Sequence, residues 1–160
     1  MYEKHAQNAR NVRRIRNRKI RRVNMTLVLI VVNLVVYFSM FILIRSHGVA
    51  VVDNFFLKPS SILAGEKLWT LVTNMFIHSP TFPLHIMVNM ISLFFVGNFL
   101  ESLIGNKRFF LIYILSGIMA SVFFVFAALL FTADLDISAV GASGAIFGIA
   151  GVLTVLTPRA

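Results

Sequence analysis

Three polar side chains of types that take part in chemistry lie within apolar stretches of this sequence. His85 and Asn89 are four residues apart in one stretch, and Ser143 lies in another, within Gly141-Ala142-Ser143-Gly144. A hydroxyl can act as a nucleophile, whereas imidazole and amide groups can donate hydrogen bonds to a developing negative charge. Because polar groups inside a membrane segment are costly, each of the three needs a reason to be there.

Each of these residues also has a purely structural interpretation. A serine within a helix often bonds back to its own backbone. A histidine near a helix end commonly lies at the membrane interface, and glycines on one helix face usually serve close packing. Taken singly, the residues leave both interpretations open.

The elements that must position these residues are four apolar runs. The chain has 160 residues, of which 58% are hydrophobic and 13% charged, against about 45–50% and about 25% in ordinary soluble domains. Each run is near the roughly 20 residues that span a bilayer, and a backbone in lipid must satisfy its hydrogen bonds within the segment. The sequence therefore predicts an all-α membrane protein, a polytopic bundle with four transmembrane helices at about 25–44, 84–104, 109–131 and 137–156.

A basic tail precedes the first run. Residues 1–24 hold nine basic residues against one acid, which gives a net charge of +8. Such a tail could bind nucleic acid or flank a membrane helix on its cytoplasmic side. The apolar run that follows directly favours the flank, with no nucleic-acid partner. That run is also longer than the roughly 7–15 residues of a signal-peptide core, so we expect a retained helix.

The placement of lysine and arginine predicts the orientation of the transmembrane domain, residues 25–160. We expect the amino terminus and the turn at 101–108 on the cytoplasmic side, and the acidic loop near Asp134 outside. The loop at 45–83 is then external, and it is long enough that it should have structure of its own. The expected location is an integral, multi-pass position in the cell (plasma) membrane.

The candidate residues share one depth in this topology. His85 and Asn89 share a helix face near the external start of their helix, and Ser143 falls about 9 Å below the start of a helix over 137–156. If these two helices pack together, the three side chains can meet in a shallow, water-accessible cavity. A glycine stripe on the last helix would pack against a neighbour, while Ser143 and Phe147 point elsewhere. The stripe consists of Gly141, Gly144, Gly148 and Gly151.

These residues resemble the rhomboid family of intramembrane serine proteases. The Gly141-Ala142-Ser143-Gly144 sequence is similar to the family's motif on its fourth helix, and His85-x-x-x-Asn89 to the histidine and asparagine of its second helix. Glu101 and Gly105 match the acidic residue and the glycine that close that helix. The end of the long loop also resembles the family, at Trp69, Thr73, Phe76 and His78.

The resemblance implies a role for each residue. Ser143 would be the nucleophile, and its backbone N–H with the side chains of His85 and Asn89 would form the oxyanion hole. Glu101 would fix the cytoplasmic end of the second helix, and His78 would order the external loop. Transmembrane proteins would be the substrates. No cofactor or metal is expected, because the chain has no cysteine and no metal-ligand spacing.

The sequence departs from the family pattern at three points. Thr70 stands where the family usually has an arginine, and Phe147 where a tyrosine often stacks on the catalytic histidine. The family's general base is a histidine on a sixth helix, and none of the four histidines here corresponds to it. We therefore expect a truncated piece of a longer protein that does not turn over substrate as it stands. The alternative is a non-catalytic rhomboid-like protein that binds client transmembrane helices.

Overall fold

The computed structural model describes residues 23–79, 82–131 and 134–158. Within these residues, three helical stretches are long and apolar enough to cross a membrane: α2 (Met25–His47), the continuous stretch Pro83–Ile104, and α7 (Asn106–Phe131). The last helix, α8 (Ser143–Leu156), has only 14 residues. The chain is thus an integral, multi-pass membrane protein built from helices. The basic tail lies almost wholly outside the described residues.

Local sequence signals set the helix ends. The Asn24 side chain accepts a hydrogen bond from the Leu27 N–H at 2.9 Å and caps the start of α2. Gly48 ends that helix with a φ of 83°, a conformation that glycine adopts without steric cost. The observed α2 is therefore three residues longer than the predicted 25–44.

The predicted helix over 84–104 is interrupted by one turn of different geometry. Its parts are α5 (Pro83–Ser92), the π-helical turn η4 (Leu93–Gly97) and α6 (Asn98–Ile104). A π-turn inserts one extra residue into a helix. Gly97 closes this turn, and a Cβ atom there would lie 2.9 Å from Cγ2 of Thr26, so the glycine lets α2 approach closely.

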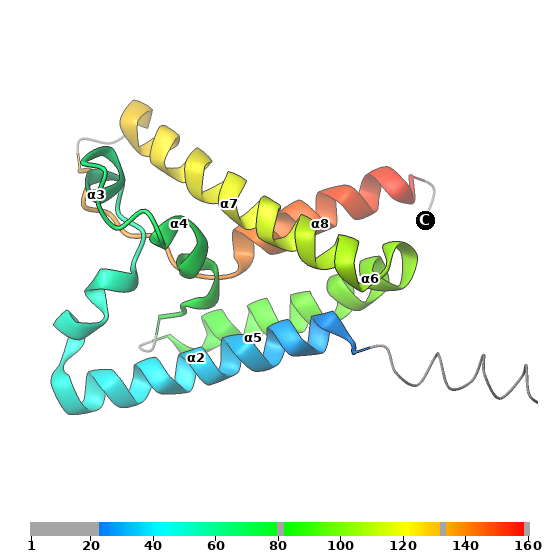
Figure 1. The fold of residues 1–160 in the computed structure, drawn as a ribbon, viewed down its shortest axis with the longest axis horizontal. Coiled ribbons are helices and arrows are strands. Elements are labelled where there is room, and N and C mark those ends of the chain that lie inside the picture. Colours follow the sequence, from blue (N-terminus) through cyan, green and yellow to red (C-terminus); the bar gives the residue numbers. More distant parts are fainter. Residues whose placement is uncertain (1–22, 80–81, 132–133, 159–160) are drawn as a thin grey trace, which may run out of the picture.

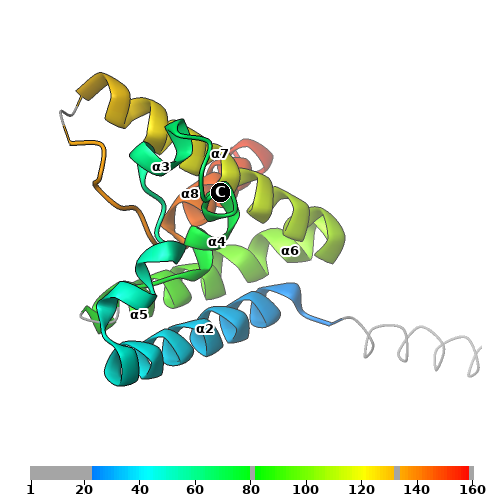
Figure 2. The ribbon, with the colours of Figure 1, turned by 60° about the vertical axis from the view of Figure 1, so that its left-hand side comes forward.

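The longer helices form two groups (Figures 1 and 2). In both views α2 runs alongside α5 and α6, while α7 crosses α8 on the other side. A core between the groups buries large side chains from all of them, and many other apolar side chains face outward, as expected in lipid. The fully buried core side chains include Leu93, Leu100, Phe109, Tyr113 and Ile149.

The segment between α2 and α5 has structure of its own, as predicted for 45–83. It contains α3 (Pro59–Leu63), α4 (Thr70–Thr73) and the short 3₁₀ turns η1 (Val49–Val51), η2 (Asp53–Phe55) and η3 (Asn74–Phe76). Leu57 and Ala139 exchange both backbone hydrogen bonds, so this loop pairs with the segment that leads into α8. The two loops close the end of the bundle opposite the start of α2 (Figure 1).

The predicted start of the last helix is corrected by this pairing. Residues 137–142 are not helical, and α8 begins at Ser143. The backbone of Ala139 and of Gly141 instead bonds to Leu57 and Asn74, which competes with helical hydrogen bonding.

Candidate active site

Ser143 is the first residue of α8, and not a residue about 9 Å inside it. The first intrahelical bond runs from the Ile146 N–H to the Ala142 carbonyl at 3.0 Å. The N–H groups of the first turn therefore have no partner within the helix, and they lie at the positive end of its dipole. The Ser143 hydroxyl makes no hydrogen bond to any residue that the structure describes, whereas Ser121 and Thr154 bond back to their own helices.

Gly141 brings the serine segment against α5. Its φ is 114°, a backbone conformation that residues with a side chain rarely adopt. A Cβ atom at Gly141 would lie 2.8 Å from both Cε1 and Nε2 of His85, and 3.6 Å from Nδ2 of Asn89. The histidine ring and the asparagine amide thus lie directly against the backbone two residues before Ser143. Both the conformation and the space at this position require glycine.

His85 and Asn89 lie one turn apart on α5, as their spacing predicts. Pro83 opens this helix, and the His85 N–H donates to the Phe82 carbonyl at 3.0 Å. Asn89 is buried, and its Nδ2 donates to the His85 carbonyl at 3.0 Å. Because an amide nitrogen carries two hydrogens, a second N–H of Asn89 remains available on the side that faces Gly141.

His78 lies behind this pair, in the loop before α5. Its ring is fully buried and meets the His85 ring edge-on, with 5.3 Å between the ring centroids. Nε2 of His78 accepts a hydrogen bond from the Ala142 N–H at 3.4 Å. Burial, followed by repulsion from His85, lowers the pKa of His78 to about 4, so the ring is neutral near pH 7. His78 therefore orders the serine segment as well as its own loop.

Sequence reasoning missed Asn74, which holds the same segment from the other side. Its carbonyl accepts from the Gly141 N–H at 2.9 Å, and its side chain donates to the Ser121 hydroxyl at 2.8 Å. Ser121 in turn bonds to the Gly117 carbonyl, and Gly117 packs against Met75. Gly117 and Ser121 are four residues apart in the third apolar run and therefore share a helix face. This small and polar face could have indicated that another segment packs there.

Two of the four glycines of the predicted stripe pack closely against α7. A Cβ atom at Gly144 would lie 2.5 Å from Cβ of Ala120, and one at Gly148 would lie 2.2 Å from Cβ of Ser116. Gly141 precedes the helix and packs on His85, as described above. A Cβ atom at Gly151 would meet no atom of a neighbouring element within 4 Å, so no described residue requires a glycine there for close packing.

Phe147 is not stacked on a histidine among the described residues. Its side chain is 77% exposed on the outer side of α8. It does point away from the glycines that pack on α7, as predicted.

Glu101 joins two helices rather than closing its own. Its carboxylate accepts from the backbone N–H groups of Met25 and Thr26 at 2.7 and 2.8 Å, and from the Thr26 hydroxyl at 2.7 Å. It thereby satisfies free donors at the start of α2. Gly105, with a φ of 82°, ends α6 four residues later and donates to the Glu101 carbonyl. This cluster lies far from Ser143, at the start of α2.

The site places Ser143, whose hydroxyl has no hydrogen-bond partner among the described residues, two residues after the glycine that packs on His85 and Asn89. Such an arrangement is suited to stabilise an oxyanion that forms when a serine attacks a carbonyl. Among the described residues, no three His, Asp or Glu side chains are grouped so that they could hold a metal ion. The fold and the site together define a multi-pass membrane protein with a polar site at the start of its last described helix, α8.

Comparison with known proteins identifies the family. Residues 65–160, more than half of the chain, match the Rhomboid domain, and the chain belongs to the rhomboid family. It is 37% identical over 90 residues to the putative rhomboid protease YdcA and 35% identical over 96 residues to the rhomboid protease GluP, both of Bacillus subtilis. It is also 34% identical over 97 residues to the inactive RHOMBOID-like protein 8 of Arabidopsis thaliana.

These matches cover only part of this chain and only part of each relative. They include 56%, 60% and 61% of this chain, and 42%, 17% and 25% of the respective relatives. The chain thus spans less than half the length of each relative. The family includes both proteases and an inactive member, so membership alone does not decide between catalysis and binding.

Proposed function

We propose that this chain carries the nucleophile and the oxyanion donors of an intramembrane serine endopeptidase. Ser143 attacks the scissile carbonyl, and the oxyanion is held by the Ser143 N–H and the side chains of His85 and Asn89. The observation that carries the proposal is the contact of His85 and Asn89 with Gly141, two residues before Ser143. Removal of one such donor costs about 10²–10³ in rate in serine proteases.

A fluorophosphonate probe tests the nucleophile directly, because it labels activated serines without requiring a peptide substrate. We expect labelling, in membranes, of a protein that carries this chain together with the general-base histidine, and loss of this labelling in Ser143→Ala. Ser46→Ala is the matched control, since Ser46 is a helical serine whose hydroxyl bonds back to its own helix. Equal labelling of Ser143→Ala and the unmodified chain would remove Ser143 from the mechanism.

The second candidate function is non-catalytic binding of client transmembrane helices. It is favoured by the similarity to an inactive rhomboid-like relative. Absence of Ser143-dependent labelling, together with capture of transmembrane segments that is unchanged in Ser143→Ala, would support this alternative.

The proposed substrates are transmembrane proteins, cleaved near their external ends, and the proposed location is the cell membrane with a cytoplasmic amino terminus. The charge pattern supports this orientation. The exposed Lys107 and Arg108 lie on the first turn of α7, where Asn106 bonds to Val23 just before α2, whereas Asp134 and Asp136 follow the opposite end of α7. In the sequence, the basic tail directly precedes α2. Because the chain has no cysteine, Ser138→Cys and Lys107→Cys can each be treated with an impermeant maleimide on intact cells. We expect labelling at position 138 alone, and the reverse pattern would invert the topology.

A further inference from the structure

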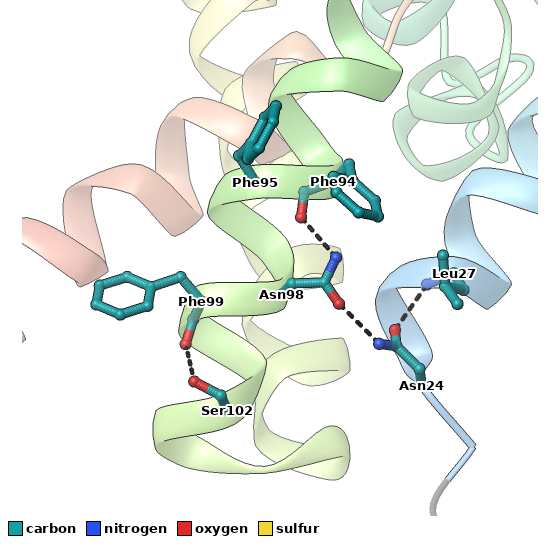
Figure 3. A pocket seen from close by; sticks show the side chains of 7 residues that line it. All are labelled: Asn24, Leu27, Phe94, Phe95, Asn98, Phe99 and Ser102. Carbon is teal, nitrogen blue, oxygen red and sulfur yellow. Dashed lines mark hydrogen bonds between the residues drawn. The ribbon is translucent and has the colours of Figure 1, made fainter.

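A groove lies between the start of α2 and the η4–α6 part of its neighbour, away from the candidate active site (Figure 3). Its volume is about 570 Å³, within the range of roughly 300–1,000 Å³ that holds small ligands. Aromatic and aliphatic side chains form most of its surface, and three polar residues complete it. The lining residues are Asn24, Leu27, Phe94, Phe95, Asn98, Phe99 and Ser102.

The apolar part of the groove is open to whatever surrounds the helices. Phe94, Phe95 and Phe99 are all exposed, and Phe95 is the most exposed, at 68%. In a multi-pass membrane protein, such side chains on the outer face of a helix contact lipid chains. The apolar wall therefore suits one hydrocarbon chain, which gains stabilisation with each buried methylene group.

The polar part of the groove offers donors. Nδ2 of Asn24 donates to Oδ1 of Asn98 at 2.7 Å, and Nδ2 of Asn98 donates to the Phe94 carbonyl at 2.6 Å (Figure 3). Each amide nitrogen carries two hydrogens, and the hydrogen bonds to described residues use one of each. One N–H per amide thus remains for a ligand. Phosphate and ester oxygens of a phospholipid only accept hydrogen bonds, so they complement this surface.

Charge at this end of the bundle favours an anion. Lys107 and Arg108 are exposed on the first turn of α7, and the neighbouring Asn106 donates its side-chain N–H to the Val23 carbonyl, next to Asn24. Glu101 is an acidic residue at the same end of the bundle, and its carboxylate accepts three hydrogen bonds from the start of α2. Lys107 and Arg108 outnumber this one carboxylate, so the described residues at this end of the bundle have a net positive charge.

We propose that this groove is a binding site for an anionic phospholipid. One acyl chain lies along Phe94, Phe95 and Phe99, and the phosphate accepts hydrogen bonds from the free amide N–H groups of Asn24 and Asn98. The basic residues at this end of the bundle select the anionic headgroup over a zwitterionic one. Each such residue near a membrane surface favours an anionic lipid by about fivefold. This site does not depend on proteolytic activity.

Quenching by brominated lipids tests the proposal. Trp69 is replaced by phenylalanine, and a single indole is then introduced by Phe95→Trp or, as a matched control, by Phe123→Trp. Phe123 is similarly exposed, at 70%, but lies on α7 outside the groove. The full chain is placed in vesicles of phosphatidylcholine and phosphatidylglycerol, in which one lipid at a time carries bromine on its acyl chains.

We expect brominated phosphatidylglycerol to quench the Phe95→Trp indole at least about five times as effectively as brominated phosphatidylcholine does. At Phe123→Trp the two lipids should quench equally. Asn98→Leu in the Phe95→Trp chain should weaken quenching by both lipids, because it removes a donor to the phosphate that both headgroups carry. Lys107→Gln combined with Arg108→Gln should abolish the preference, because it removes the charges that select the anionic headgroup. Addition of inorganic phosphate should not displace the lipid.

Several results would overturn the proposal. Equal quenching by both lipids at position 95, or the same preference at 95 and 123, would mean that no specific site exists. An indole at 95 that neither lipid quenches would mean that protein covers the groove. Displacement by inorganic phosphate would mean a headgroup site without an acyl-chain groove. If the tryptophan variants do not fold, native mass spectrometry of the unmodified chain decides: retention of phosphatidylglycerol over phosphatidylcholine supports the site, and equal or no retention contradicts it.

Discussion

Replacement of Glu101 by glutamine tests how strongly α2 is held to the rest of the bundle. The carboxylate accepts three hydrogen bonds, two from N–H groups and one from a hydroxyl, while only 8% of the residue is exposed. Glutamine has almost the same shape, but one of its oxygens is replaced by an NH₂ group. In either orientation this group faces an N–H of Met25 or Thr26, so a donor meets a donor.

The magnitude follows from the bonds that are lost. A hydrogen bond to a charged group contributes about 1.5–3 kcal/mol, and a carboxylate at a helix start contributes about 0.3–1 kcal/mol through the helix dipole. Glu101→Gln loses at least one such bond together with the charge. We therefore expect the free energy of unfolding to fall by about 2–4 kcal/mol, which lowers the Tm by roughly 5–15 °C in a chain of this size.

Thermal unfolding of the purified chain in detergent micelles measures this effect. Glu66→Gln is the control, because Glu66 is exposed in the loop between α3 and α4. Thr26→Val, alone and combined with Glu101→Gln, completes a double-mutant cycle that isolates the hydroxyl–carboxylate bond. A Glu101→Gln Tm within the error of Glu66→Gln, or strictly additive effects in the cycle, would refute this account of the contact.

Three further predictions follow from the site. The lowered pKa of His78, about 4 in the folded chain against 6.5 unfolded, means that the unfolded chain binds more protons between these values. Stability should therefore fall as the pH drops through that window, by up to about 3 kcal/mol, and His78→Gln should flatten the dependence of Tm on pH. Gly144→Val should lower the Tm by several degrees because Ala120 occupies the space, whereas Gly151→Ala should leave it unchanged or raise it slightly; equal effects would contradict the packing. Asn89→Leu should slow fluorophosphonate labelling about 10²–10³-fold without loss of the folded state by circular dichroism, and an unchanged rate would remove Asn89 from the oxyanion hole.

The long helices could be predicted from the sequence because the signals that define them are local. The apolar runs at 25–44 and 109–131 became α2 and α7 with only a few residues added at one end. Capping by Asn24 and termination at Gly48 and Gly105 also depend on neighbouring residues alone. Helical spacing was sufficient to place His85 and Asn89 on one face of α5.

The start of α8 could not be predicted, because distant partners determine it. Residues 137–142 are as apolar as the helix that follows, but Leu57 and Asn74 take their backbone hydrogen bonds. The same reason applies to Glu101, whose partners at Met25 and Thr26 are about 75 residues away. Hydropathy and spacing carry no information about such pairings.

The π-turn at Leu93–Gly97 couples the two ends of the α5–α6 helix. Twelve residues separate Asn89 from Glu101, and at 100° per residue a regular helix would point them roughly 120° apart. The π-turn contains one residue more than an α-helical turn, so the angle between the two side chains is that of eleven residues, roughly 20°. If these residues instead formed a regular α-helical turn, with none removed, α6 would rotate about its axis by nearly a third of a revolution. Either Asn89 or Glu101 would then leave its partners, although the two lie at opposite ends of the same span.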